Sequence, residues 1–174
     1  MLTACCVSIQ AHPTDRVRTR HFRLIEPMSD YETRFAGLRR LYGSERFALL
    51  RELHMCVVGL GGVGSWSVEA LARSGVGRLT LIDYDEVCAS NVNRQIHATT
   101  AAFGRKKIDV LAERVAQINP DIECTVVDDF LTDRNHRDLL ERGYDYVIDA
   151  IDSIRYKAVM IYTCKRNKIP IITT

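Results

Sequence analysis

A glycine-rich turn lies between a short apolar run and a helical pattern at residues 55–74, and this order restricts the possible folds more than any other feature of the chain. The run MCVVG (55–59) is typical of a strand buried on both faces of a parallel sheet. It leads into GLGGVG (59–64), and a helix is expected over 62–74. In such a turn the backbone can approach a phosphate, and the helix N-terminus presents free N–H groups. The order predicts a nucleotide-binding α/β domain whose candidate phosphate-binding residues are Gly59, Gly61, Gly62 and Gly64.

The rest of the chain alternates between strand and helix patterns. Two short helices, at 29–42 and 44–53, precede the first strand. Further strands are expected at 78–83, 122–128, 144–150 and 169–174, and further helices at 104–118, 134–142 and 153–167. Alternation of this kind predicts a doubly wound, mostly parallel, Rossmann-like α/β sheet with right-handed crossovers.

The two ends of the chain depart from this pattern. The formal net charge of +2 arises within residues 1–27, which are expected to be a disordered or non-native extension outside the fold. The charges of the remaining residues cancel, so bulk charge does not indicate nucleic-acid binding. At the other end the pattern stops after the fifth strand, without a closing helix. We therefore expect the C-terminal part of the fold to be missing from this sequence.

The cysteines and the apolar runs indicate the redox environment of the protein and whether a membrane span is expected. The six cysteines include no C-x-x-C pair and no zinc site by spacing, which favours reduced, mostly buried thiols in a cytosolic protein. No run approaches the roughly 18 apolar residues of a membrane span. Trp66, on the helix after the glycine turn, is expected in the hydrophobic core.

Polar side chains follow the second expected strand. Asp83 ends that strand roughly 20 residues after the glycine turn, where a carboxylate can accept hydrogen bonds from ribose hydroxyls. The next segment, SNVNRQIH (90–97), has no apolar period and holds Asn91, Arg94 and Gln95. Because ligands of such sheets bind at the carboxyl ends of the strands, these are candidate binding residues.

The charge of the ligand decides which nucleotide fits these residues. A helix N-terminus nearly satisfies the two phosphates of a dinucleotide, whereas a triphosphate needs further cations and amide donors. Arg94 can hydrogen-bond phosphate oxygens with two parallel N–H groups, and Lys107, in the first turn of helix 104–118, is a second candidate cation. Lys107 opposes the helix dipole, so we expect another charge to compensate it, and Lys106 lies about 100° away around the helix. Asp152, after the fourth strand, is the candidate magnesium ligand.

Each of these residues also has an ordinary structural interpretation. Arg94 can form a surface ion pair, Lys107 can lie on a solvated helix face, and Asp152 can cap helix 153–167. Packing of helix on strand explains Gly64 but not all four glycines. We favour a binding site because the combined spacing is harder to explain structurally than any single residue.

These motifs resemble those of the ThiF/MoeB/HesA family, relatives of the ubiquitin-activating enzymes. The shared features are the glycine turn, an Asp-x-Asp after the second strand, Asn-x-x-Arg-Gln, a helix-start lysine and an aspartate after the fourth strand. The resemblance runs from about Met28 to Thr174. Within the family, RFAGLRRLYG (34–43), SNVNRQIHA (90–98) and DAIDS (149–153) are most similar to the tRNA threonylcarbamoyladenosine dehydratases.

The resemblance implies that residues 28–174 are the N-terminal portion of a domain that uses ATP and Mg²⁺ to activate a carboxylate as an acyl-adenylate. In a dehydratase, a nitrogen of the carbamoyl group of threonylcarbamoyladenosine in tRNA then closes on the activated carboxyl. By position, the residues implied are Gly59, Gly61, Gly62 and Gly64 for phosphates, Asp83 for ribose, Asn91, Arg94, Gln95 and Lys107 for the triphosphate, and Asp152 for Mg²⁺.

The resemblance also implies partners. In the homodimers of this family an arginine from the partner's N-terminal segment reaches the phosphates; Arg40 is our choice here, with Arg39 and Arg34 as alternatives. The substrate is expected to be a tRNA in the cytoplasm, with a sulfur-relay protein as a possible partner.

Three other functions remain open. The first is adenylation of the C-terminus of a ubiquitin-like sulfur carrier, although such activators typically have Asp-Asn where this chain has Asp152-Ser153. The second is a dinucleotide oxidoreductase, which binds NAD without magnesium. The third is a non-catalytic nucleotide-binding remnant, because the chain is expected to be truncated.

Overall fold

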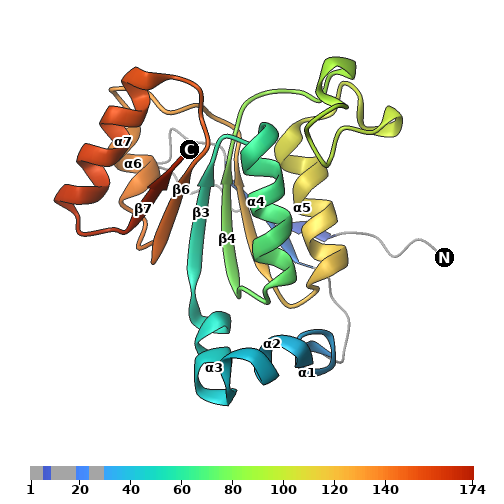
Figure 1. The fold of residues 1–174 in the computed structure, drawn as a ribbon. Coiled ribbons are helices and arrows are strands. Elements are labelled where there is room, and N and C mark those ends of the chain that lie inside the picture. The colour runs from blue at the N-terminus through green and yellow to red at the C-terminus, as the bar shows by residue number, and fades with distance from the viewer. Residues whose placement is uncertain (1–5, 9–18, 24–29) are drawn as a thin grey trace.

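A seven-stranded sheet forms the centre of the computed structural model, which describes residues 6–8, 19–23 and 30–174 (Figure 1). The strand order is β1-β2-β5-β4-β3-β6-β7. The strands are β1 (Cys6–Ser8), β2 (Thr19–Arg23), β3 (His54–Val58), β4 (Arg78–Ile82), β5 (Glu123–Val127), β6 (Tyr146–Asp149) and β7 (Ile171–Thr173). Strands β3 to β7 pair in parallel, whereas β1 and β2 are antiparallel. This confirms the predicted doubly wound, mostly parallel, Rossmann-like fold.

Helices cover both faces of the sheet. They are α4 (Gly62–Arg73) and α5 (Lys107–Ile118) on one face, and α6 (His136–Leu140) and α7 (Ile154–Arg166) beside β6 and β7 (Figure 1). Successive residues of a strand point to opposite faces, so β3 contributes to two cores. Val57 packs with residues of α4 and α5, whereas Cys56 and Val58 pack with residues of α6 and α7. This explains why the run at 55–59 is apolar without alternation.

Three short helices precede β3 and form a small core of their own, so the single helix predicted at 29–42 is divided in two. The three helices are α1 (Tyr31–Arg34), α2 (Ala36–Tyr42) and α3 (Ser44–Glu52). Tyr31, Phe35 and Phe47 are buried together, and the ring centroids of Tyr31 and Phe35 are 4.7 Å apart. The helices lie at the amino ends of the central strands, opposite the loop between β4 and α5 (Figure 1).

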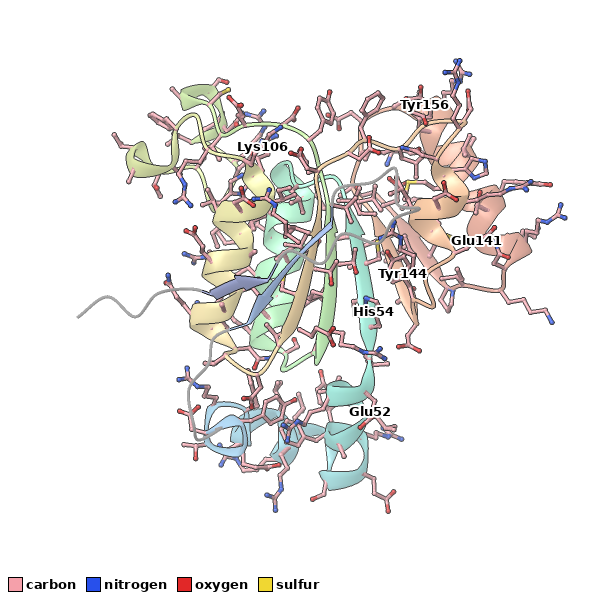
Figure 2. The ribbon with its side chains drawn as sticks, turned by 180° about the vertical axis from the view of Figure 1, so that it is seen from behind. Glu52, His54, Lys106, Glu141, Tyr144 and Tyr156 are labelled. Atoms are coloured by element: carbon pink, nitrogen blue, oxygen red, sulfur yellow. The ribbon has the colours of Figure 1, made fainter. Side chains whose placement is uncertain are left out.

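The carboxyl ends of β3 and β6 mark the point where the strand order reverses. Strands β4 and β5 continue from one side of β3, and β6 and β7 from the other. The loops after β3 and β6 therefore leave in opposite directions and open a crevice, which is where such sheets bind ligands. Figure 2 shows Lys106 and Tyr156 at this end of the molecule, while Glu52 and His54 lie toward the opposite end.

The N-terminal segment differs from the expectation that it lies outside the fold. Thr19–Arg23 pairs antiparallel with β5, and Cys6–Ser8 pairs with β2. The guanidinium of Arg20 lies 2.9 Å from the carboxylate of Asp109 on α5. The sequence TRHFR has too few apolar residues for a strand to be recognised by alternation. The other residues of 1–27 lie outside the described part of the chain.

Two further expectations concern cysteines and membranes. Cys56, Cys124 and Cys164 are buried and Cys88 is exposed, and all four are free thiols. Burial raises the pKa of the Cys124 thiol to about 12. Within the described residues, no helix is both long enough and apolar enough to cross a membrane.

Candidate functional site

A pocket of about 750 Å³ opens at the carboxyl ends of β3, β4 and β6. It is lined by segments that are far apart in the sequence: the turn before α4, the loop after β4, the first residue of α5, the segment after β5 and the segment after β6. Of the predicted site residues, it brings together Gly59, Gly61, Gly62, Asp83, Asn91, Arg94, Gln95, Lys107 and Asp152. Gly64 and Arg40 do not line it.

The four glycines of the turn have different structural roles. Gly59 has φ +87°, and a Cβ there would lie 2.7 Å from the carbonyl oxygen of Ala150. A Cβ on Gly64 would lie 1.8 Å from the carbonyl oxygen of Gly59, so Gly64 serves packing of α4 against the turn. In contrast, a Cβ on Gly61 or Gly62 would meet no protein atom closer than 3.5 Å. The space above Gly61 and Gly62 belongs to the pocket, at the N-terminus of α4.

Asp83 ties the glycine turn to the end of β4. Its Oδ2 accepts a hydrogen bond from the N–H of Leu60 (2.6 Å), and its Oδ1 accepts one from the N–H of Asp85 (2.8 Å). The carboxylate is buried, and this desolvation raises its pKa despite the two hydrogen bonds. Each carboxylate oxygen can accept a further hydrogen bond from a ligand in the pocket.

The polar loop is held against α4 by two side chains of that helix. The indole N–H of Trp66 donates to the carbonyl oxygen of Arg94 (3.0 Å), and the N–H of Ile96 donates to the hydroxyl of Ser65 (3.4 Å). Trp66 is 54% exposed, so the prediction that it belongs to the core is wrong. Its role follows from the polar end of the indole, which finds an acceptor while the ring stays at the surface.

Arg94 lies over the start of α4. Its aliphatic carbons would be 3.5 Å from a Cβ on Gly62, and its guanidinium donates to the carbonyl oxygen of Ser90 (2.9 Å) and to Oδ1 of Asn93 (3.0 Å). No carboxylate of the described residues forms an ion pair with Arg94. The charge of its guanidinium therefore remains uncompensated beside the helix N-terminus.

Asn91 and Gln95 are the buried amides of this loop. Asn91 Oδ1 accepts from the N–H of Cys88 (3.0 Å), which shapes the 3-10 turn η1 (Ala89–Asn91). Gln95 is 5% exposed, and its Oε1 has no hydrogen-bond partner among the described residues. A buried amide oxygen without a partner is unfavourable, so a ligand or water donor at this point would stabilise it.

The positive charge of Lys107 is compensated by a carboxylate, as predicted from its unfavourable position at a helix N-terminus. It is the first residue of α5, is 5% exposed, and its Nζ lies 2.7 Å from Oδ2 of Asp85. Lys106 faces elsewhere, because its Nζ lies 3.1 Å from Oδ1 of Asp128. Only one of the two lysines lines the pocket, as predicted, but the helical angle is not the reason, because Lys106 is the extended N-cap residue that precedes α5.

Asp152 lies on the pocket wall after β6. The N-cap of α7 is Ser153, and it makes no side-chain capping bond, so the helix-capping interpretation of Asp152 does not hold. The Asp152 carboxylate is exposed and forms no hydrogen bond or ion pair within the described residues. The described residues contain no group of three or more His, Cys, Asp or Glu side chains able to hold a metal by themselves. A single free carboxylate beside a phosphate-sized space suits a Mg²⁺ that also binds phosphate oxygens, because Mg²⁺ usually takes one or two carboxylates.

An apolar wall faces these polar groups. The rings of Tyr84 and Phe130 are 5.1 Å apart and half exposed, and Leu131, Ile151 and Tyr156 continue the wall. This wall, the hydrogen bond of Trp66 to the polar loop and the pairing of Asp85 with Lys107 were not predicted from the sequence. Phe130 and Leu131 follow the third parallel strand, so their place at the ligand-binding edge was a usable signal.

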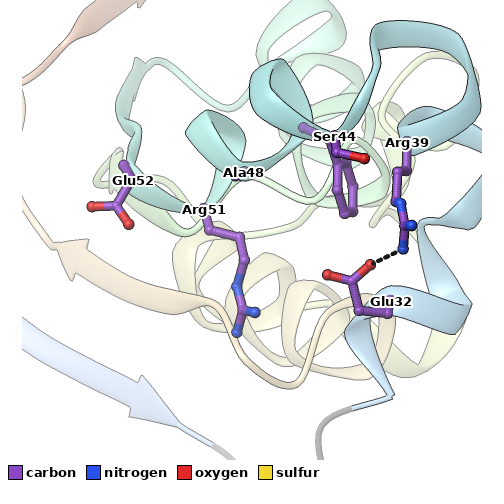
Figure 3. A pocket seen from close by; sticks show the side chains of 7 residues that line it. Glu32, Arg39, Ser44, Ala48, Arg51 and Glu52 are labelled. Carbon is purple, nitrogen blue, oxygen red and sulfur yellow. Dashed lines mark hydrogen bonds and ion pairs between the residues drawn. The ribbon is translucent and has the colours of Figure 1, made fainter.

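The three candidate arginines lie on α1 and α2, at the other end of the molecule. Arg34 forms an ion pair with Asp30, and Arg39 forms one with Glu32 (3.3 Å). Arg39 and Glu32 line a second pocket, of about 610 Å³, between these helices and α3 (Figure 3). Arg40 is exposed and has no ion pair within the described residues. None of the three reaches the nucleotide-sized pocket of its own chain.

Comparisons with known proteins identify the family of this chain. Residues 33–174 match the ThiF family. The chain is 54% identical to a tRNA threonylcarbamoyladenosine dehydratase of Haemophilus influenzae, over 84% of this chain and 56% of that protein. It is 36% identical to a molybdopterin-synthase adenylyltransferase of Salmonella typhimurium, over 71% of this chain and 49% of that protein.

A solved structure shares the fold. The crystal structure of E. coli tRNA N6-threonylcarbamoyladenosine dehydratase in complex with ATP superimposes with a TM-score of 0.82 and 53% identity, over 86% of this chain and 61% of that one. The chain thus spans about half the length of the curated relatives it matches.

Proposed function

Because the chain belongs to the ThiF family, we propose that residues 28–174 are the nucleotide-binding adenylation part of an ATP-dependent tRNA threonylcarbamoyladenosine dehydratase. The proposal concerns the whole protein, since this chain spans about half of its relatives. We also propose that the enzyme acts on tRNA in the cytoplasm, with a sulfur-relay protein as a candidate partner.

One observation carries the proposal: two cations from separate elements line the same pocket as the glycine turn. Arg94 comes from the loop after β4 and Lys107 from the start of α5, and both line the pocket with Gly61 and Gly62. A triphosphate needs such a set of donors, whereas a dinucleotide does not. The related E. coli dehydratase has been solved with ATP, which supports the same ligand here.

The pocket has two walls that suit the two ends of ATP. The glycine turn, the start of α4, Arg94 and Lys107 form the polar wall, and Tyr84, Phe130 and Leu131 form an apolar wall on which a purine can pack. Asp83 lines the same pocket at the end of β4, where a carboxylate can accept hydrogen bonds from ribose hydroxyls.

In this reaction ATP is a substrate, and the protein stabilises charge. A carboxylate oxygen of the threonyl group attacks the α-phosphorus of ATP, and the bond to pyrophosphate breaks. A carbamoyl nitrogen then attacks the activated carbonyl carbon, loses its proton and displaces AMP. Arg94 and Lys107 would stabilise the negative charge that gathers on the phosphates in the first step. Ring closure within one molecule has an effective molarity of up to ~10⁵–10⁸ M, so no second activated intermediate is required.

A magnesium ion fits the free Asp152 carboxylate. When bound, Mg²⁺ supplies positive charge to the phosphate oxygens. Asp152 would hold it from the segment after β6, which lines the same pocket as Arg94 and Lys107.

We also propose a homodimer in which the partner supplies an arginine. Arg40 lies on α2, away from the pocket of its own chain, so it can contact a bound nucleotide only in the pocket of a second copy. Arg34 and Arg39 are paired with acidic side chains, which favours Arg40 among the three.

A titration separates ATP binding from dinucleotide binding. We expect ATP with Mg²⁺ to bind this chain and NAD not to bind. Arg94→Ala and Lys107→Ala should each weaken ATP binding by about 10–100-fold, the loss typical of one charge-assisted contact. Binding of NAD without ATP binding would overturn the proposal.

Adenylation of a ubiquitin-like sulfur carrier is the second candidate, supported by 36% identity to a molybdopterin-synthase adenylyltransferase. Both candidate reactions use the same pocket, and they differ in the carboxylate that is adenylated. Nucleosides of tRNA from cells with and without the intact gene separate them. A dehydratase predicts that cyclic threonylcarbamoyladenosine is lost with the gene, and an unchanged level would favour the sulfur carrier.

A further inference from the structure

A buried ion pair lies directly behind the segment that carries Asp152. Asp149 is the last residue of β6 and is 0% exposed. Lys157, near the start of α7, places its Nζ 3.2 Å from both oxygens of the Asp149 carboxylate. A buried carboxylate without a cation is strongly unfavourable, so the pair is required as long as either charge is present.

The ion pair and two hydrogen bonds enclose the backbone of residues 150–153. At one end, Asp149 Oδ1 accepts from the N–H of Ile151 (3.2 Å). At the other, the N–H of Lys157 donates to the carbonyl oxygen of Ser153 (2.9 Å). All four enclosed residues line the pocket, whereas Asp149 and Lys157 do not. The pair therefore acts on the pocket only through the segment it encloses.

The enclosed segment has little room to move. The N–H of Ala150 donates to the carbonyl oxygen of Val58 (2.8 Å). On its other side, Ala150 lies so close to Gly59 that a Cβ on the glycine would be 2.7 Å from its carbonyl oxygen. The peptide N–H and hydroxyl of Thr174 donate to the carbonyl oxygen of Asp149 at 3.2 and 3.3 Å. Together with these contacts, the charge pair at the base of the segment fixes where Asp152 stands relative to the glycine turn.

We propose that Asp149 and Lys157 are positioning residues, which hold Asp152 where it meets a divalent cation carried by the bound nucleotide. The inference rests on the proposed ATP function and adds residues that touch neither nucleotide nor metal. Partners that orient a metal ligand typically contribute about 10–100-fold to metal affinity. An apolar pair of similar volume would fill the same space without fixing the direction of the segment.

The test compares nucleotide binding with and without metal, in the full chain. ATP affinity is measured in EDTA and in Mn²⁺, a paramagnetic substitute for Mg²⁺, and bound Mn²⁺ is followed by electron paramagnetic resonance. Lys157→Met should leave affinity in EDTA within about twofold and lower the affinity for Mn²⁺–ATP at least about tenfold. Lys157→Arg, which keeps the positive charge, should retain most of the affinity for Mn²⁺–ATP.

A matched control comes from the same helix. Lys165 also lies on α7, is exposed and does not line the pocket, so Lys165→Met should change neither affinity. Lys157→Met leaves the Asp149 carboxylate buried without a partner and risks unfolding. The double variant Asp149→Asn/Lys157→Gln removes both charges, and we expect it to fold and to show the same loss of metal-dependent affinity.

Two results would overturn the inference: metal-dependent affinity unchanged in folded Lys157→Met, or unchanged in the double variant. Failure of the proposed function has a different signature. In that case the unmodified chain would not bind ATP at all, or Asp152→Ala would leave the metal dependence intact.

Discussion

Gly61 and Gly62 differ from Gly59 and Gly64 in what surrounds their α-carbons. The first two face the pocket, whereas the other two face protein backbone at distances no Cβ can occupy. A substitution in one turn is therefore expected to affect nucleotide binding at some positions and the fold at others.

Gly64→Ala should destabilise the fold by roughly 3 kcal/mol, because its Cβ would overlap the carbonyl oxygen of Gly59. Gly62→Ala should leave stability near that of the unmodified chain and weaken ATP binding. Gly37→Ala is the matched control: it lies in exposed α2 with no atom within 4 Å, and should gain about 0.5–1 kcal/mol. Urea unfolding measures all three. Equal stability of the Gly64 and Gly62 variants would contradict this division of roles.

His97 gives a prediction of pH dependence. It is 3% exposed, both ring nitrogens lack partners within the described residues, and burial together with the Lys107 ammonium lowers its pKa to about 4. In the unfolded chain the imidazole has its ordinary pKa of about 6.5. Between these values the unfolded state binds more protons. The contribution of His97 is therefore fully present above pH 6.5 and is lost as the pH falls toward 4.

The expected loss of stability over that range is roughly 3 kcal/mol from His97 alone. His97→Gln removes the titrating group, so its free energy of unfolding should vary less between pH 6.5 and 4. Urea unfolding at several pH values measures the slope. A slope identical to that of the unmodified chain would show that the imidazole is not buried in its neutral form.

At the scale of elements, the loop after β4 depends on α4 for its position. Trp66 and Ser65 of α4 hold the backbone at Arg94 and Ile96, and η1 holds Asn91. The helix thus serves the site twice, through its N-terminus and through the side chains that hold the loop.

Trp66→Phe should lower ATP affinity by about 2–10-fold, the value of one hydrogen bond, with stability nearly unchanged. A smaller aromatic ring remains at the surface, and the N–H donor to the Arg94 carbonyl is lost. Tyr162→Phe, a half-exposed aromatic on α7 that does not line the pocket, is a control for the loss of a surface polar group. If Trp66→Phe binds ATP as well as the unmodified chain, the loop is held by its other contacts.

At the scale of the whole molecule, the two ends of the sheet have separate tasks. The carboxyl ends carry the pocket, and the amino ends carry the three short helices with Arg40. The edges also differ: β2 covers β5 on one side, and β7 is the outer strand on the other.

Removal of residues 1–27 tests the edge formed by β2. It would expose the backbone of β5 and remove the ion pair between Arg20 and Asp109. We expect a loss of roughly 1–3 kcal/mol in stability and greater aggregation, with ATP affinity retained because β2 does not line the pocket. Stability equal to that of the full chain would support a non-native extension.

The sequence by itself determined the five parallel strands, the helical segment before β3 and most of the pocket. Apolar runs and helical periods are local signals, and parallel strands bring their carboxyl ends to one edge whatever the loops contain. Gly61, Asp83, Arg94, Lys107 and Asp152 could therefore be assigned to one site from their places after strands and at helix starts.

Only the tertiary structure decided the contacts between segments that have no fixed spacing. The carbonyl acceptor of Trp66, the Asp85 partner of Lys107, the apolar wall at Phe130 and the Asp149–Lys157 pair each join residues from different elements. So does the pairing of Thr19–Arg23 with β5. Such contacts depend on side-chain directions and strand neighbours, which a local pattern of apolar residues does not encode.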